Sequence, residues 1–595
     1  MTSLRLWAPN CSRVRVLVAG SAASMTAADD GWWAGPDLAP GTDYTFLLDD
    51  ADEPVPDPAS RWQPAGVHGP SRVYDQSAYP WGDTAWAGRE LGRPGASVGD
   101  AVVYELHVGT FTPGATLESA IERLDHLVGL GVTHVELLPV NAVNGVWNWG
   151  YDGVGWYAVH EPYGGPDALK RFVDACHARG LALVLDVVYN HLGPSGNYLP
   201  RFGPYLKSGR NTWGDLVNVE EPAVRSFVVE NALMWLRDFH VDALRLDAVH
   251  ALHDDSPTHI LAELSAAVDA LAATLGRPLT LIAESDLNDP VMITPRPTGH
   301  GLAAQWDDDV HHALHSALTG ERQGYYCDFG PLSVLAKVLT SAFLHDGTYS
   351  TFRGRVHGAP VDLASTAGWR FVACLQNHDQ VGNRAVGDRL PEITSSGLLR
   401  VGAVLLLTSP FTPMLWMGEE WAASTRWPFF TSHPEPELGR ATGEGRLAEF
   451  GDHGWDVSQM IDPQDPAAYR GAILDWDELA GPAHRSMLEL YRALIALRAA
   501  EPDLRDGDLT AVQVEYDEDE RWILVHRGSF VAVANLSAES RTVAVQASGV
   551  VLATGAVELG DATAIIAPES AAVLRCGRSA VQPPAAVGPH RADLR

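Results

Sequence analysis

The sequence predicts a protein of several domains, in which a central (β/α)8 barrel lies between an N-terminal immunoglobulin-like β-sandwich and a small C-terminal β-domain. Three observations predict this architecture. The chain has 595 residues, too many for one simple core. Its middle alternates nearly continuous apolar runs with amphipathic helical patterns, which is typical of buried parallel strands covered by helices. Both ends contain short alternating strands between turn residues.

The N-terminal domain is predicted over residues 1–90. In RVRVLV and DYTFLLDD every second residue is apolar, and clusters of Gly, Pro and Asp separate such runs. Alternation of this kind is expected of strands that bury one face, as in a sandwich. We therefore expect a carbohydrate-binding-like β-sandwich, followed by a Pro/Gly-rich joint, LGRPGASVGD.

The barrel is predicted over residues 91–500, where eight apolar runs are strand candidates. The runs are residues 102–108, 134–140, 181–188, 243–249, 279–285, 302–308, 371–378 and 412–418. Helical patterns separate them, and the first is expected to bury one face carrying Leu117, Ile121, Leu124 and Val128. An open doubly wound sheet would more often carry a glycine fingerprint after its first strand, and none is present, so a barrel is favoured.

The C-terminal β-domain is predicted over residues 505–577, where short strands return. The strand candidates are VQVEY, RWILVHRG, FVAVANLS, TVAVQ and VLATG. Residues 578–595 are rich in Pro and Ala, which predicts a flexible tail.

Composition excludes several classes of partner. The formal net charge of −33 argues against nucleic acid and anionic membranes, which need basic surface, and suits an enzyme acting on a neutral substrate. The five cysteines form an odd set without CxxC pairs, which is typical of a reducing compartment. The start MTSLRLWAP has no signal-peptide pattern, and no apolar run reaches transmembrane length. We therefore predict a cytoplasmic enzyme.

Three acidic residues each end an apolar, strand-like run: Asp247 in VDALRLDAVH, Glu284 in LIAESD and Asp379 in LQNHDQVGN. Burying a carboxylate is costly unless it is paired or takes part in chemistry. A buried ion pair would explain any one of them, whereas three together point to one acidic site at one end of the sheet. A glycosidase needs such a site, with one carboxylic acid, one carboxylate and a polarising environment.

Further polar residues follow the predicted strands, at the end of the barrel where active sites lie. They are His107, Asp186, Asn190, His191, Arg245, His250, Asp307, Asp308, His311, His312, Asn377 and His378. Two aromatic loops, NGVWNWGYDGVGWY and MLWMGEEWAASTRWPFF, offer flat faces on which sugar rings can stack. Within the first, Tyr151 in its Gly-rich turn is the favoured site residue.

The predicted roles of the acids depend on their neighbours. Arg245 precedes Asp247 by two residues, so both side chains face the same side of the strand. Its cation is expected to keep Asp247 ionised, as a nucleophile requires. Glu284 has no basic residue adjacent in sequence, so a raised pKa would suit it as the acid. Asp379 would then stabilise the positive charge of the transition state.

These segments resemble a known family. DVVYNH, ALRLDAVH, ESDLN and QNHDQ stand in the order of the four conserved segments of the α-amylase superfamily of glycoside hydrolases, and the match runs from about residue 101 to 500. The resemblance implies that Asp247 is the nucleophile, Glu284 the acid/base and Asp379 the transition-state stabiliser. It also implies retention of anomeric configuration, with carboxyl groups about 5–5.5 Å apart. The substrate-binding candidates are Tyr151, His191, Arg245, His250, Asp308, His311, His312, His378, Gln380 and Asn383.

Within the superfamily, one group is most similar. PDPASRWQPAGVHGPS, YELHVGTFTPGAT, RLDAVHALHDDS, QWDDDVHHALH and NHDQVGNRAVGDRL resemble enzymes that cleave the α-1,4-glucosidic bond next to the terminal trehalose of maltooligosyl trehalose. The implied substrate is a neutral α-glucan, and the products are trehalose and a maltooligosaccharide. NAVNGVWNWGYDG departs from the shorter, Arg-containing approach expected before the turn at Tyr151.

Asn190 matches a position that binds calcium in many amylases, but no acidic cluster with ligand spacing lies elsewhere in the sequence. We therefore predict no metal and no cofactor. Two rival functions remain open at this stage. A glycogen branching or debranching enzyme would share the domains and the catalytic residues but differ in acceptor or linkage. The other rival is a non-catalytic carbohydrate-binding barrel, although such a barrel would have no need of three acidic residues at one mouth.

Overall fold

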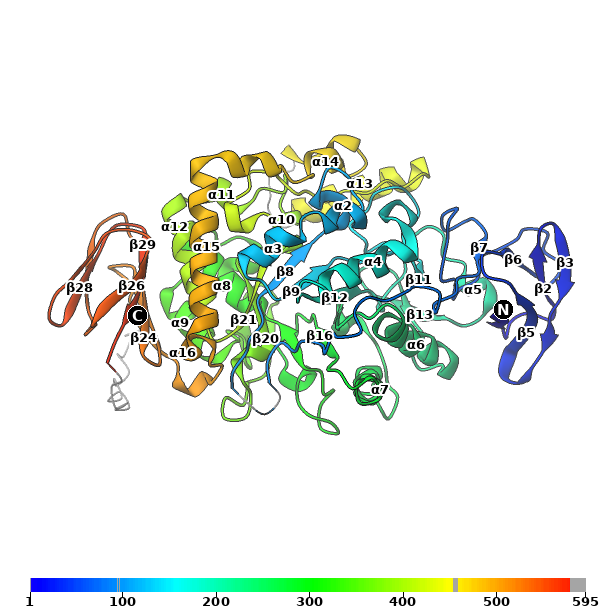
Figure 1. Ribbon diagram of the computed structural model, residues 1–595, viewed down its shortest axis with the longest axis horizontal. Helices are drawn as coiled ribbons and strands as arrows, with labels where there is room; N and C mark the ends of the chain where they lie inside the picture. Colours follow the sequence, from blue (N-terminus) through cyan, green and yellow to red (C-terminus); the bar gives the residue numbers. More distant parts are fainter. Residues whose placement is uncertain (1, 94, 96, 453–458, 578–595) are drawn as a thin grey trace.

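The computed structural model describes residues 2–577 except 94, 96 and 453–458, so the predicted tail over 578–595 lies outside the described residues. The molecule is elongated (Figure 1), with the N-terminal strands at one end, the C-terminal strands at the other, and the barrel with its helices between them. In the part of the chain that is described, no helix is long and apolar enough to cross a membrane.

Eight parallel strands close into a barrel, which confirms the predicted fold. They are β8 (Val103–Leu106), β9 (His134–Leu137), β12 (Ala182–Val187), β15 (Ala243–Leu246), β16 (Thr280–Ala283), β17 (Ala304–Trp306), β20 (Phe371–Cys374) and β21 (Thr412–Trp416). They follow one another around the barrel in chain order, and β21 pairs with β8 to close it. Each predicted run contains one strand but is longer than the strand. The run continues into the loop at the C-terminal end, where the polar candidates lie.

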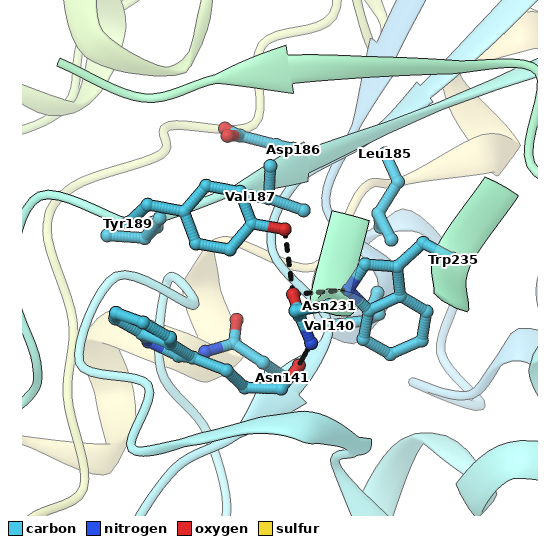
Figure 2. A pocket seen from close by; sticks show the side chains of 10 residues that line it. Val140, Asn141, Leu185, Asp186, Val187, Tyr189, Asn231 and Trp235 are labelled. Atoms are coloured by element: carbon cyan, nitrogen blue, oxygen red, sulfur yellow. Dashed lines mark hydrogen bonds between the residues drawn. The ribbon is translucent and has the colours of Figure 1, made fainter. Parts of the chain in front are cut away.

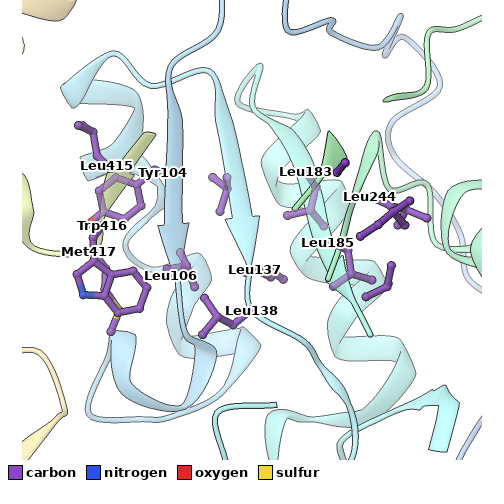
Figure 3. Packing of buried hydrophobic residues seen from close by; sticks show 14 of the residues in the cluster. Tyr104, Leu106, Leu137, Leu138, Leu183, Leu185, Leu244, Leu415, Trp416 and Met417 are labelled. Carbon is purple, nitrogen blue, oxygen red and sulfur yellow. The ribbon is translucent and has the colours of Figure 1, made fainter. Parts of the chain in front are cut away.

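The pleat of the strands separates two cores. Leu183 and Leu185 of β12 face outward into the large core between strands and helices, part of which Figure 3 shows. Val184, between them, faces the barrel interior, where it packs with Val103 and Ile282 in a separate apolar cluster. Above this apolar layer the interior becomes polar, because the next inward residue of β12 is Asp186.

The first helical region differs from the prediction. It forms two short helices, α2 (Leu117–Ile121) and α3 (Leu124–Leu130), instead of one continuous helix. Val128 is 43% exposed, so its predicted place on the buried face is wrong, and Leu127 and Leu130 are buried instead. The break between the helices restarts the periodicity, which the sequence pattern alone did not reveal.

The terminal β-regions each contain two sheets. The N-terminal sheets are β1-β5-β4 and β3-β2-β6-β7, from β1 (Thr2–Trp7), β2 (Val14–Val18), β3 (Ser21–Ser24), β4 (Thr26–Ala27), β5 (Trp32–Leu38), β6 (Asp43–Leu48) and β7 (Ser71–Arg72). The C-terminal sheets are β22-β23-β24-β29-β26 and β25-β28-β27. Their strands are β22 (Gln513–Asp517), β23 (Trp522–Arg527), β24 (Phe530–Asn535), β25 (Arg541–Ala544), β26 (Gly549–Ala553), β27 (Val557–Leu559), β28 (Thr563–Ile566) and β29 (Ser570–Arg575). The last three are additional to the five expected strands.

A charged network attaches the segment after the N-terminal sheets to the N-terminal end of the barrel. His177, the last residue of α4 (Gly165–His177), lies between two carboxylates, with Nδ1 2.8 Å from Asp83 and Nε2 2.9 Å from Asp242. Asp242 also accepts hydrogen bonds from Trp86 at 2.8 Å and Arg277 at 3.0 Å. The Trp86 ring stacks on the His177 ring with centroids 4.5 Å apart. We refer to these five residues as the floor network.

Candidate active site

Arg245 is the centre of the polar layer that lies above the apolar layer of the barrel interior. It is fully buried on β15, and its guanidinium lies 4.3 Å from the centre of the Trp306 ring. Its Nη1 lies 2.9 Å from Asp186 and 2.7 Å from Asp247, and its Nη2 lies 3.5 Å from Glu284. One cation from one strand therefore contacts carboxyl groups that follow or belong to three neighbouring strands. A buried guanidinium requires such partners, because desolvation penalises an unpaired charge.

Asp247 is held by a second donor besides Arg245. Asn190, in the loop after β12, donates from Nδ2 to the Asp247 carboxylate at 2.7 Å and to its backbone carbonyl at 3.0 Å. The Asn190 amide oxygen faces His191 Nδ1 at 2.5 Å. The amide thereby fixes the orientation of the Asp247 side chain. The two residues meet because they follow β12 and β15, which are neighbouring paired strands.

Glu284 lies beside Asp247, at the end of the next strand, β16. Ala248 donates its backbone N–H to the Glu284 carboxyl group at 2.6 Å. Ala248 has the left-handed conformation with φ of 40°, which costs strain in a residue that carries a Cβ. Burial raises the pKa of Glu284, and Asp247 and Asp379 raise it further against the opposing effect of Arg245. The direction of this shift favours the protonated form of Glu284.

The third acid stands opposite, on α10 (His378–Gly382) after β20. Asp379 Oδ2 lies 3.4 Å from His378 Nε2, and its Oδ1 accepts a hydrogen bond from Asn383 at 3.3 Å. Its side chain is 40% exposed, compared with 13% for Asp247 and 15% for Glu284. Asp379 is thus the acid most open to a ligand, and Asn383 is placed at its side.

Tyr151 joins the two halves of the site. Its hydroxyl donates to Asp186 at 2.6 Å and lies 2.8 Å from His378 Nε2, while its ring stacks on the His378 imidazole. His191 Nε2 lies 2.9 Å from the Tyr151 backbone carbonyl and holds the Gly-rich turn in place. Despite the nearby Arg245, burial raises the pKa of Asp186 to about 7.

The remaining candidates lie around this centre at different depths. Asp308 begins the helix that follows β17, and burial, followed by repulsion from Glu284 and Asp379, raises its pKa to about 8. His250 Nε2 lies 3.8 Å from Asp286, at the rim. Gln380 accepts a hydrogen bond from Tyr325 at 3.3 Å, and His312 packs against the same tyrosine ring.

His311 occupies a different environment from the other candidates. It is 1% exposed on α8 (Asp308–Thr319), its Nε2 lies 3.2 Å from the Tyr326 hydroxyl, and it packs against His312 and His315. These contacts lie behind the mouth, so the structure does not group His311 with the three acids as the sequence analysis did. A position shortly after a strand does not by itself show whether a side chain on the following helix faces the mouth or points away from it.

Glu105 and Trp306 contact the site but were not among the predicted site residues. Glu105 lies on β8 and contacts His378, and Trp306 lies under Arg245. Both sit inside apolar runs that predict only a buried strand. The single sequence indication was Glu105 itself, a charged residue at an inward position of a buried strand.

A small cavity of ≈ 10 Å³ behind β12 is separate from this site. Figure 2 shows Tyr189, Asn231 and Trp235 around it, joined by hydrogen bonds, while the Asp186 carboxylate points away from them. Over residues 2–577, with the gaps stated above, no group of three or more His, Cys, Asp or Glu side chains has the arrangement of a metal site.

Comparison with known proteins adds the family to this geometry. A family model described as the α-amylase catalytic domain matches residues 96–203, and one described as a domain of unknown function (DUF3459) matches residues 507–574. Malto-oligosyltrehalose trehalohydrolase of Rhizobium sp. (strain M-11) is 52% identical, over 96% of this chain and 97% of its own length. The same-named protein of Arthrobacter ramosus is 54% identical, over 96% and 99%. The chain belongs to the malto-oligosyltrehalose trehalohydrolase family.

A solved structure gives the same result for the fold. A putative α-amylase from Salmonella typhimurium is 36% identical, with 96% of this chain and 97% of that chain covered and a TM-score of 0.88. This chain belongs to the malto-oligosyltrehalose trehalohydrolase family and matches the α-amylase catalytic domain, so it is a glycoside hydrolase, as the resemblance predicted. An α-glucan oligosaccharide is accordingly its class of substrate.

Proposed function

We propose that this enzyme hydrolyses the α-1,4-glucosidic bond next to the terminal trehalose of maltooligosyl trehalose, releasing trehalose and a maltooligosaccharide with retention of configuration. The observation that carries the mechanism is the position of Arg245, whose guanidinium contacts both Asp247 and Glu284. Two carboxyl groups on one cation are close enough to act on one sugar carbon, as a retaining enzyme requires. The names of the family's members support the choice of substrate.

In the first step, an Asp247 carboxylate oxygen bonds to the anomeric carbon while the bond to the leaving oxygen breaks. Glu284 gives its proton to that oxygen, and trehalose departs as a neutral alcohol. Arg245 and Asn190 hold the attacking carboxylate in place. Asp379, opposite them, offers negative charge to the positively charged sugar ring of the transition state.

In the second step, Glu284 is ionised and takes a proton from water. The water oxygen bonds to the anomeric carbon, the bond to Asp247 breaks, and the maltooligosaccharide leaves with its original configuration. Glu284 recovers its proton in this step. Its raised pKa suits the role, because an acid/base works best when its pKa lies near the working pH.

Product analysis tests this function. The purified enzyme is incubated with maltooligosyl trehalose and, separately, with glycogen, and the products are separated by chromatography. We expect free trehalose and a maltooligosaccharide from the first substrate. New or lost α-1,6 branches in glycogen, without trehalose from the first substrate, would instead support the branching or debranching alternative.

We also propose a cytoplasmic location. All five cysteines are unpaired thiols, as expected in a reducing compartment. Fractionation of the producing cell tests this: the enzyme is expected with the cytoplasmic proteins, and recovery from the medium would contradict it.

A further inference from the structure

Glu105 is a buried carboxylate that the proposed mechanism does not use. It lies on β8 and is 1% exposed. Its Oε1 lies 2.5 Å from His378 Nδ1, and its Oε2 accepts the His378 backbone N–H at 3.0 Å. Both oxygens therefore contact one residue. A carboxylate buried in a barrel interior costs free energy. Within the part of the chain that the structure describes, the hydrogen bonds of the Glu105 side chain both go to His378.

We propose that Glu105 is a positioning residue, which holds the His378 side chain as a doubly protonated imidazolium and so sets the direction of the hydrogen bonds that run to Tyr151 and Asp186. The inference rests on the proposed function, because it assigns Glu105 a part in the same site.

The contacts beyond His378 require this direction. The Tyr151 hydroxyl has one proton and lies within hydrogen-bonding distance of two groups, Asp186 at 2.6 Å and His378 Nε2 at 2.8 Å. If Nε2 carries a proton, it donates to the tyrosine oxygen, and the tyrosine donates to Asp186. If Nε2 carries none, two acceptors compete for the one tyrosine proton: either the buried Nε2 is left without a donor, or Asp186 loses the tyrosine bond and keeps only its contact with Arg245.

The surroundings of the imidazole favour the cation. Asp379 and Glu105 raise the pKa of His378 to about 9 against the effects of burial and of Arg245. Five aromatic rings lie around it, with centroids between 5.2 and 6.5 Å away, and the nearest is stacked face to face on the imidazole, an arrangement that attracts a cation. They belong to Tyr151, Trp149, Trp306, Trp416 and Trp427. His107, also close, stays neutral because burial lowers its pKa to about 3.

Glu136 provides a matched control one strand away. It pairs with Glu105 in the register of β8 and β9 and is equally buried. Burial, with repulsion from Glu105 and Asp186, raises its pKa well above its ordinary value, so it is a neutral acid. Glu136→Gln therefore replaces one neutral group by another of the same shape, in the same layer of the barrel.

The test is a double-mutant cycle between Glu105→Gln and His378→Asn, with Glu105→Asp and Glu136→Gln as companions. We expect Glu105→Gln to lower kcat by about 10- to 100-fold with a smaller change in KM. Its loss of activity at alkaline pH should begin at lower pH than in the wild type, since the imidazolium loses its counter-charge. Glu105→Asp, which keeps the charge, should recover part of kcat, and Glu136→Gln should stay within about threefold of wild type.

The cycle separates positioning from a merely structural role. If Glu105 acts through His378, the double variant loses no more activity than His378→Asn alone. Losses that multiply, or a Glu105→Gln enzyme with wild-type kcat, would overturn the proposal. Thermal melting of each variant identifies any that fail to fold, and Glu105→Asp then carries the cycle in place of Glu105→Gln.

The outcome is independent of the substrate assignment. Each variant is assayed both on maltooligosyl trehalose and on maltoheptaose, a plain α-1,4 glucan. If the wild type releases no trehalose but cleaves maltoheptaose, the proposed function fails, while the cycle is still measured on the second substrate.

Discussion

Two histidine–carboxylate networks lie at opposite ends of the same barrel and use the same chemistry for different purposes. In the floor network, at the N-terminal ends of the strands, His177 lies between Asp83 and Asp242. At the mouth, His378 lies between Glu105 and Asp379. Nearby carboxylates raise the pKa of both histidines above the ordinary value, against burial.

The two networks differ in whether their charges are balanced. In the floor network, two carboxylates meet two basic groups, His177 and Arg277, and a third, His240, lies 2.8 Å from Asp83, while Asp242 accepts four hydrogen bonds. At the mouth, carboxyl groups outnumber the two cations Arg245 and His378, and burial, followed by repulsion between these carboxyl groups, raises the pKa of Glu284 and Asp308. Balanced pairing stabilises the fold, whereas the shortage of cations keeps a proton available for catalysis. The following predictions test this contrast, from the largest expected effect to the smallest.

The largest effect is expected at the mouth. Asp247→Asn removes the nucleophile and should lower kcat by about 10⁴-fold or more. Its thermal midpoint should stay equal to that of the wild type or rise, because one of several crowded carboxylates loses its charge. Kinetics and melting curves of the same preparation check both results. A parallel loss of stability would mean that Asp247 is a structural ion-pair partner like those of the floor.

The opposite pattern is expected for Asp242→Asn in the floor network. The change leaves His177 and Arg277 short of a buried counter-charge and should lower the free energy of unfolding by about 3–5 kcal/mol. The kcat of the folded enzyme should remain near the wild-type value, because the reacting groups lie at the other end of the strands. Urea unfolding and kinetics decide this, and a fall in kcat without a fall in stability would refute the division of roles.

The floor network should also give a pH dependence of stability with a definite sign. The folded-state pKa of His177 is raised, so its stabilisation is complete below the unfolded value of about 6.5 and is lost as pH rises through the folded-state pKa. Melting temperatures of the wild type should therefore fall over this range, and those of His177→Gln should fall less. Parallel curves for the two proteins would contradict the assignment.

The smallest effect is expected for Trp86→Phe. The phenyl ring keeps the stack on His177 but loses the indole N–H that donates to Asp242 at 2.8 Å. Because the carboxylate oxygen keeps its bond from Arg277, the cost should be about 1 kcal/mol. A difference in urea midpoint between this variant and the wild type measures it, with kcat expected to be unchanged.

The contrast also explains what the sequence could predict. Asp247, Glu284 and Asp379 were predictable because each ends an apolar run, and the ends of parallel strands meet at one edge. Tyr151 was predictable from its Gly-rich turn among aromatic residues. The strand-end rule therefore gave most of the site, and the structure places these residues around Arg245 and His378.

Other features depend on packing that local patterns do not encode. Glu284 has no basic neighbour in sequence, which predicted a raised pKa, yet Arg245 lies 3.5 Å away in the structure, and burial is the main cause of the shift. Glu105 meets His378 across 273 positions of sequence. Val128 fits the helical period but lies outside the core, because the helix is interrupted.

The central claim is that Asp247 forms a covalent bond to the sugar while Glu284 supplies the proton. A 5-fluoro-α-glycosyl fluoride, which forms the intermediate faster than it is hydrolysed, should label the enzyme with one sugar per chain. Peptide mass spectrometry is predicted to place that label on Asp247, and Asp247→Asn should take none. A label on Glu284 or Asp379, or rapid turnover with inverted configuration and no label, would contradict the account.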